Sequence, residues 1–441
     1  MMNAYSTYKH SGIDWLDKIP SHWSSVRAQY LFDIVSGSTP NSTDETLWDG
    51  DIRWITPADF KTEDRYISTG KRTISKKGYD TCSTTLLPAG SIIFSKRAPI
   101  GKVVIAKNEL CTNQGCFGCI PSKLLSNEYF YYLMSILEPQ YNLLGSGSTF
   151  MEISAKEFCS FKLLFPPLDE QEAIAAFLDE KTAKIDALTA EKQSQVEELC
   201  AYRTSLISET VTRGLNSNAP LRHSGIDWLG DIPEHWVISP LKYLVSEPLA
   251  YGANEAPQEE IDMANPRYIR ITDINDTDGS LKHETYRTLE LHKAQPYLLK
   301  KGDVLFARSG ATVGKTYRFI EDYPCCFAGY LIRARCNESL DSEYLIYFTN
   351  SLCYTNWKNS IFNQSTIQNI AADKYNNLPI AVPTLSEQHE IVAFLKEKTS
   401  KIDKAISELE AQLEELAEYK KAVITEAVTG KVDVRDWKPK E

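Results

Sequence analysis

The distribution of apolar residues predicts two very long helices, one in the middle of the chain and one near its end. The first runs from Asp169 to Arg213 and contains no Gly or Pro. Asp169 is placed to cap its start, and the acidic residues Glu170 and Glu172 are favourable in its first turn. Apolar residues recur at seven-residue steps, with others between them: Leu178, Ile185, Leu199 and Leu206, with Ile174, Leu188 and Tyr202. A helix of roughly 64 Å with one apolar stripe needs a partner helix.

The partner is in the same chain, between Ser386 and Thr429. Its seven-residue step has no gap: Leu395, Ile402, Leu409, Leu416 and Val423. The two stretches align at a constant offset of 217 residues, which pairs Glu170 with Glu387. We therefore expect two similar rods packed along each other. The sequence does not show their direction, but antiparallel packing is favoured because each globular segment must connect the end of one rod to the start of the next.

A second repeat precedes each globular segment. Residues 10–23 read HSGIDWLDKIPSHW and residues 223–236 read HSGIDWLGDIPEHW. Each copy combines large hydrophobic residues with a proline, which indicates a non-helical strap. We expect the tryptophans of each strap to pin the entrance of the globular module that follows: Trp15 and Trp23, then Trp228 and Trp236.

The globular segments, roughly 24–160 and 237–377, repeat the same order of short strand-like runs between Gly and Pro residues. Gly90 to Phe94 pairs with Gly302 to Phe306, while the residues between such shared positions differ strongly. The order is therefore module, rod, module, rod. A duplicated scaffold with unlike surfaces is what two recognition modules for two different targets would show.

Charge is unevenly distributed along the 441 residues. The formal net charge is −11, but 169–215 and 386–433 together carry −9 of it. Residues 61–107 hold 10 basic and 3 acidic residues, and residues 282–318 hold 8 and 3. A local basic surface, whatever the global charge, is what phosphate binding requires.

No apolar run is long enough for a membrane span, and the N-terminus lacks a signal peptide's apolar core, so we expect a cytoplasmic protein with no membrane partner. Of the ten cysteines, Cys111, Cys116 and Cys119 form a cluster that metal binding could explain. No fourth ligand stands at a zinc-like spacing, so we interpret them as reduced, buried thiols and expect no metal.

One motif resembles a phosphate-binding loop, SGATVGKT at 309–316. It departs from the pattern at Ser309 and is followed by strand-like residues, where a phosphate loop needs a helix. A turn between two strands, presenting basic residues to a polyanion, is the better interpretation. We find no catalytic residues and no cofactor site, so the sequence indicates a recognition protein and not a catalyst.

The straps, the Pro-Leu-Asp-Glu-Gln and Thr-Leu-Ser-Glu-Gln openings at 167–171 and 384–388, and the helix endings at 209–212 and 426–429 resemble the specificity subunits of type I restriction–modification systems. This resemblance implies an α+β chain of two mixed α/β target-recognition domains, joined by two long helices packed as an antiparallel coiled coil with a pseudo-twofold repeat. It implies domains at 1–165 and 217–380, spacer helices at 166–216 and 381–433, and a tail at 434–441.

The resemblance also implies a non-catalytic subunit that binds a bipartite target in double-stranded DNA. Two methylation subunits and the restriction subunits would be its partners. We expect DNA contacts from basic residues and from two Ser-Thr loops: Lys76, Lys77, Lys96, Arg97, Lys102, Ser148, Thr149, Arg270, Arg308, Ser309, Lys315, Ser365 and Thr366. Alternatives are the recognition subunit of a fused nuclease–methylase system, a coiled-coil adaptor without DNA binding, and a nucleotide hydrolase using Lys315.

Overall fold

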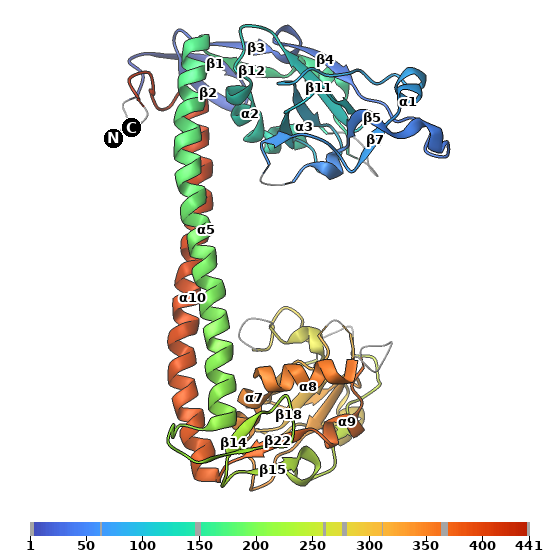
Figure 1. Cartoon of the computed structure of the whole chain (residues 1–441), viewed down its shortest axis with the longest axis vertical. Coiled ribbons are helices and arrows are strands. Elements are labelled where there is room, and N and C mark those ends of the chain that lie inside the picture. Colours follow the sequence, from blue (N-terminus) through green and yellow to red (C-terminus); the bar gives the residue numbers. More distant parts are fainter. Residues whose placement is uncertain are drawn as a thin grey trace. The chain divides into compact units, whose positions relative to one another are not determined.

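The computed structural model describes residues 4–61, 64–145, 151–258, 262–275, 280–310, 312–362 and 369–438. The chain divides into two compact units. The first contains residues 1–192 and 411–441, and the second contains residues 193–410. Both long helices contribute to both units: α5 runs over Leu168–Arg213 and α10 over Leu385–Val428 (Figure 1). The predicted rods are confirmed, although α5 begins one residue early, so Asp169 lies in its first turn.

The module of the first unit is built on a mostly antiparallel five-stranded sheet in the order β4-β11-β8-β9-β6. Its strands are β4 (Phe32–Ser36), β6 (Tyr66–Ile67), β8 (Ile92–Ser95), β9 (Val103–Ala106) and β11 (Cys116–Pro121). A second sheet combines β5 (Trp48–Ile55), β7 (Arg72–Ile74) and β10 (Cys111–Thr112), and β3 (Ser24–Arg27) pairs with β12 (Lys162–Phe165). The helices are α1 (Lys76–Thr81), α2 (Asn127–Ser135), α3 (Glu138–Leu144) and α4 (Ala155–Ser160).

The second unit repeats this topology. A four-stranded sheet has the order β16-β21-β18-β19, and β17 pairs with β20 in parallel, as β5 does with β10. The strands are β15 (Val237–Pro240), β16 (Ala250–Tyr251), β17 (Arg267–Ile269), β18 (Val304–Ala307), β19 (Thr316–Arg318), β20 (Cys325–Phe327), β21 (Leu331–Ala334) and β22 (Pro379–Val382). The helices are α6 (Leu291–Ala294), α7 (Ser342–Thr349), α8 (Leu352–Phe362) and α9 (Ala372–Asn376).

Each strap forms a short antiparallel hairpin, as its non-helical prediction requires. In the first unit β1 (Tyr8–Ile13) pairs with β2 (Leu16–Pro20), and in the second β13 (Leu221–His223) pairs with β14 (Asp231–Pro233). Trp23 and Trp236 are fully buried behind them, at 0% and 1% exposure. The pinning tryptophans are thus confirmed for the second position of each strap, whereas Trp15 and Trp228 are only partly buried.

One glutamate at the start of each long helix holds the strap tryptophan. Glu170 accepts hydrogen bonds from Trp23 Nε1 (2.9 Å) and from the Tyr5 hydroxyl (2.9 Å). Glu387 accepts one from Trp236 Nε1 (3.0 Å). Burial and the neighbouring Glu170 carboxylate raise the pKa of Tyr5, so this hydroxyl remains a donor. We call the contacts of Glu170 with Trp23 and Tyr5 the first strap latch, and the contact of Glu387 with Trp236 the second.

The next residue of each helix joins the module to the strand before it. Gln171 donates to the carbonyl of Pro166 (2.8 Å) and accepts from the Ser126 amide (2.9 Å). Gln388 makes the matching bonds, to the carbonyl of Pro383 (3.0 Å) and from the Asp341 amide (2.8 Å). The repeated Glu-Gln pair therefore satisfies buried donors and acceptors at the same place in both units.

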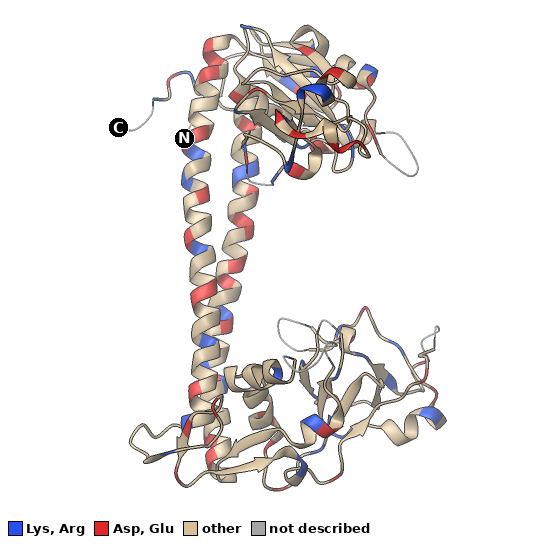
Figure 2. Ribbon diagram, turned by 45° about the vertical axis from the view of Figure 1, so that its right-hand side comes forward, with Lys and Arg blue, Asp and Glu red and all other residues tan. Residues whose placement is uncertain are grey.

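The two helices run antiparallel within each unit. In the first unit the start of α5 (Ile174) shares a core with the end of α10 (Val428), and in the second the end of α5 (Val211) shares a core with the start of α10 (Ile391). In the first unit Lys420 pairs with Asp186 (2.6 Å), and in the second Arg203 pairs with Asp403 (2.7 Å). Charged residues of both signs are spread along both helices (Figure 2).

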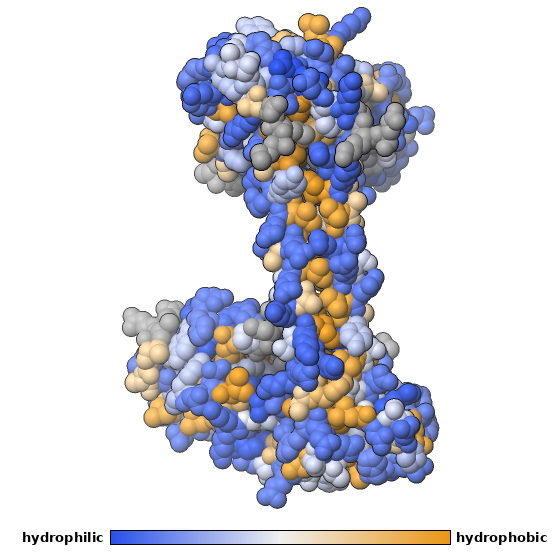
Figure 3. Space-filling model, turned by 90° about the vertical axis from the view of Figure 1, so that its left-hand side faces the viewer, coloured by the Kyte–Doolittle hydropathy of each residue, from blue (hydrophilic) through white to orange (hydrophobic). Residues whose placement is uncertain are grey.

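The apolar stripe is buried at some positions and exposed at others, and Ile185 (6% exposed) and Val196 (9%) are buried in the middle part of α5. Ile174 and Leu178 are fully buried in the core of the first unit, and Val211 is fully buried in the second. Leu188 and Tyr202, expected within the seam, are 47% and 57% exposed. Apolar residues consequently remain visible along the helices (Figure 3).

The first strap latch predicts a specific loss of stability. Glu170→Ala leaves the buried donors of Tyr5 and Trp23 without an acceptor, which we expect to lower the free energy of unfolding by about 3 kcal/mol. Chemical denaturation of the purified chain measures it. Glu172→Ala removes an exposed carboxylate two residues away and is expected to change stability by less than about 0.5 kcal/mol. Equal effects of the two substitutions would show that the latch contributes nothing.

Candidate nucleic-acid interface

Three of the five predicted basic residues of the first module lie at the turn between β8 and β9. Lys96 and Arg97 both pair with Glu152, each at 2.8 Å. Burial alone would raise the pKa of Glu152, but hydrogen bonds from the two cations lower it, so the carboxylate stays ionised. Lys96 is also 87% buried, with 13% of its side chain exposed, and lies over the ring of Phe117. The third residue of this turn, Lys102, is half-buried.

The other two predicted cations of this module lie on the short helix α1. Lys76 pairs with Asp80 (2.7 Å), and Lys77 donates to the Thr46 hydroxyl (2.8 Å). Both side chains are well exposed, so they can exchange these partners for a phosphate at little cost. They therefore lie on a different element from the β8–β9 turn.

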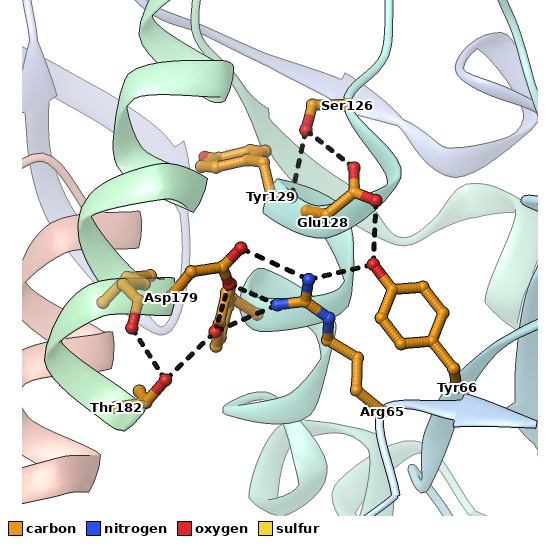
Figure 4. A network of polar contacts seen from close by, with 9 residues as sticks. Arg65, Tyr66, Ser126, Glu128, Tyr129, Asp179 and Thr182 are labelled. Carbon is orange, nitrogen blue, oxygen red and sulfur yellow. Dashed lines mark hydrogen bonds and ion pairs between the residues drawn. The ribbon is translucent and has the colours of Figure 1, made fainter. Parts of the chain in front are cut away.

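Arg65, in the basic segment 61–107, is occupied by a contact inside the first unit (Figure 4). Its guanidinium pairs with Asp179 of α5 and donates to the hydroxyls of Tyr66 (2.9 Å) and Tyr132 (3.2 Å). Tyr132 in turn donates to Asp179 (2.7 Å). Although burial opposes it, hydrogen bonding to Asp179 raises the pKa of Arg65. Arg65 thus joins the module to α5, and the surface charge is smaller than the count of basic residues suggests.

In the second module Arg270 is taken up by its own backbone turn. It donates to Asp273 (2.8 Å), which is buried, and this carboxylate accepts from the Arg270 amide (2.7 Å). Hydrogen bonding to Asp273 raises the pKa of Arg270. Arg270, predicted from the sequence to contact DNA, therefore holds a turn of its own module through Asp273.

The remaining predicted residues of this module lie on the turn between β18 and β19. Lys315 donates to the carbonyl of Ile274 (2.8 Å), and the backbone of Ser309 forms an isolated antiparallel β-bridge with Asn369. Arg308 lies over the ring of Tyr251, at 4.8 Å from the guanidinium carbon to the ring centroid. The residue after Lys315 starts β19, so the predicted strand-to-strand turn is confirmed in place of a phosphate loop.

Four predicted contacts fall outside the described residues: Ser148, Thr149, Ser365 and Thr366. The three clustered thiols are buried, as predicted, at 0% exposure for Cys111, Cys116 and Cys119. Burial raises the pKa of Cys111 to about 11. Within the described ranges, no group of three or more His, Cys, Asp or Glu side chains could hold a metal ion. No helix of that part of the chain is long and apolar enough to cross a membrane.

Two residues at the second turn carry no sequence signal. Lys358 of α8 lies against Gly314, and Tyr251 supports Arg308. Neither belongs to a motif or to a basic segment, and only the fold brings them to the turn. Lys358 lies 40 residues beyond the basic segment that identified Arg308.

The chain is a duplicated α/β module, and each copy is docked on the two long helices. With no group of metal ligands among the described residues, this architecture defines a subunit that carries two recognition modules. The sequence model of the type I restriction modification DNA specificity domain matches residues 20–198 and 249–417. The chain belongs to this family. Its members are non-catalytic specificity subunits, and the enzymatic activities of the complex belong to other subunits.

Individual relatives agree with this assignment. The type I restriction enzyme MjaIX specificity subunit of Methanocaldococcus jannaschii is 30% identical over 305 residues, 68% of this chain and 68% of that protein. The EcoDI specificity subunit of Escherichia coli is 21% identical over 446 residues, 96% of this chain and 91% of that protein. A solved chain from work on assembly of the type I R-M system has a TM-score of 0.74 at 17% identity. It covers 95% of this chain and 100% of its own, which supports the fold.

The Arg65 contact predicts coupling between module and helix. A double-mutant cycle of Arg65→Met and Asp179→Asn is expected to give a coupling free energy of about 1–2 kcal/mol, since the pair is partly exposed. Urea denaturation of the four chains measures it. Lys71→Met, which removes an exposed charge from the same segment, should show no coupling to Asp179→Asn. Additive effects for Arg65 and Asp179 would contradict the contact.

Proposed function

We propose that this chain reads a bipartite sequence in double-stranded DNA, with one module on each half-site and a non-specific spacer between them. The observation that carries this proposal is the contrast between the parts of the repeat. The tryptophan–glutamate bond of each strap latch and the glutamine contacts recur in both units, while the β8–β9 and β18–β19 turns carry different residues. A shared scaffold with unlike turns suits two modules that read two different sequences.

The helices have the surface that a protein partner requires. Tyr419 is 57% exposed in the first unit, and Leu188 is 47% exposed in the same unit. In the second unit Leu199, Tyr202 and Leu409 line one shallow groove. Apolar residues exposed in this way on both units favour docking of two methylation subunits, one to each unit, with restriction subunits joining them (Figure 3).

The methylation subunits would supply the chemistry. An adenine in each half-site would be taken out of the stack by the docked subunit, because a methyltransferase cannot reach its target atom inside the duplex. The specificity chain itself would place that subunit on the correct base pair. A coiled-coil adaptor without DNA binding has no need of two basic turns on corresponding strands. The recognition subunit of a fused nuclease–methylase system would use the same surfaces.

DNA binding through phosphates predicts a dependence on salt. In a gel shift of the chain with its methylation partner, the logarithm of the association constant should fall linearly with the logarithm of salt concentration. Six to ten phosphate contacts correspond to a loss of about 10³–10⁵ in affinity between 50 and 200 mM salt. Binding that is insensitive to salt would favour the adaptor.

The spacer should follow the length of the helices. We expect deletion of four residues from each helix, at the facing positions Lys192 and Gln412, to remove about 6 Å and shorten the spacer by about two base pairs. Neither half-site should change, because no module residue is altered. Sequencing of methylated sites measures both. Replacement of the same four residues of each helix by alanine, which keeps the length of the helices, is the control. An unchanged spacer would contradict the role of the helices.

A further inference from the structure

The turn between β18 and β19 holds Arg308, whose side-chain donors make no hydrogen bond to the described part of the chain. Six other arginines of the second module donate to protein acceptors: Arg267, Arg270, Arg287, Arg318, Arg333 and Arg335. Arg308 differs, because among the described residues its guanidinium makes only the ring contact with Tyr251 and its Nε is buried without a hydrogen-bond partner. A guanidinium held in place with unused donors is prepared for an acceptor outside the chain.

The support under Arg308 is fixed by the fold. The Tyr251 hydroxyl accepts a hydrogen bond from the amide of Ala372 (2.9 Å), at the start of α9. The carbonyl of Arg308 accepts from the Ile370 amide (2.8 Å). Both the backbone of Arg308 and the ring beneath its side chain are therefore anchored, so less conformational entropy is lost when the guanidinium binds.

A second cation lies on the same turn. Lys358 of α8 packs against Gly314, and the neighbouring Tyr354 donates to the Gly314 carbonyl (2.9 Å). Within the described part of the chain, the Lys358 ammonium has no hydrogen-bond acceptor or acidic partner, and it lies 5.1 Å from the centre of the Tyr354 ring. Its partial burial lowers its pKa, which an approaching anion would reverse.

The corresponding turn of the first module has the opposite surroundings. Lys96 occupies the position of Arg308, since each accepts the matching backbone hydrogen bond, from Ile153 (3.0 Å) and from Ile370. Glu152 neutralises Lys96, whereas Asn369 stands at its place in the second module. Where Lys358 covers Gly314, the first module has Glu138 and Tyr141 beside Gly101.

We propose that Arg308 and Lys358 are DNA contacts of the second module: Arg308 reads a guanine edge and so specifies one base pair, while Lys358 binds a phosphate and adds affinity alone. Arginine reaches the two acceptors of guanine, O6 and N7, with two parallel hydrogen bonds, while a lysine acts as a point charge. The first module uses its matching turn differently, because Lys96 is held by Glu152. This inference rests on the proposed function of sequence reading.

The test uses the complete chain in complex with its methylation subunits. Duplexes carry the methylated sequence or a single base-pair change at each position of the second half-site. Arg308→Lys keeps the charge but loses the planar fork, and we expect discrimination to fall about 10- to 100-fold at one G·C pair only. Arg308→Gln should relax the same position, which guards against an effect peculiar to lysine. The first half-site should be read as before.

Lys358→Gln should act differently from the arginine variants. We expect weaker binding to all duplexes alike, unchanged discrimination, and a salt dependence reduced by about one phosphate contact. Lys301→Ala, which removes an exposed charge from the same module, is the control and should leave both the affinity and its salt dependence unchanged. Lys96→Gln should leave the bases read in the first half-site unchanged.

The outcomes separate this inference from the proposed function. A wild-type complex without preference for any duplex would overturn both. If the wild-type complex prefers its sequence and Arg308→Lys retains the full preference at every position of the second half-site, this inference alone is overturned. Relaxation of the first half-site by Lys96→Gln would overturn the asymmetry between the two turns.

Discussion

The structure depends on one constraint: a long amphipathic helix cannot leave its apolar stripe in water. In each unit this stripe is buried against the other long helix and against the module. The strap latch makes that burial specific. Glu170 and Glu387 each accept a hydrogen bond from a buried tryptophan, which fixes where the module begins on the helix. An apolar surface alone would permit sliding, whereas buried donors must keep their acceptor.

The duplication separates what the fold requires from what recognition requires. Several contacts that hold module to helix recur in both units; Tyr129 donates to the carbonyl of Val428, and Tyr344 to that of Val211, at 3.1 and 3.2 Å. The turns beyond the sheet are free of this requirement and differ in charge. One has a carboxylate between two cations, and the other has an arginine supported by a tyrosine. Binding properties can thus change while the scaffold stays constant.

The long helices and the straps could be predicted from sequence, because period and repetition are local properties. The exposure of Leu188 and Tyr202 could not, since Ile185 and Val196 on the same part of α5 are buried and only the packing decides which positions face inward. The same limit applies to basic residues. Counting charges identified the turns, but it could not identify the partners of the basic residues. The partner of Lys96 is Glu152, far along the chain. Asp273 is only three residues after Arg270, but its carboxylate reaches the guanidinium because the backbone turns there. Lys358 reaches its turn through the packing of α8 alone.

The most direct test is to map modified adenines across the genome of a host that expresses this chain with its methylation partner. The account predicts one sequence made of two unlike specified parts, with an adenine on opposite strands in the two parts and a constant number of unspecified base pairs between them. A single uninterrupted specified sequence, or a variable gap between the parts, would contradict it.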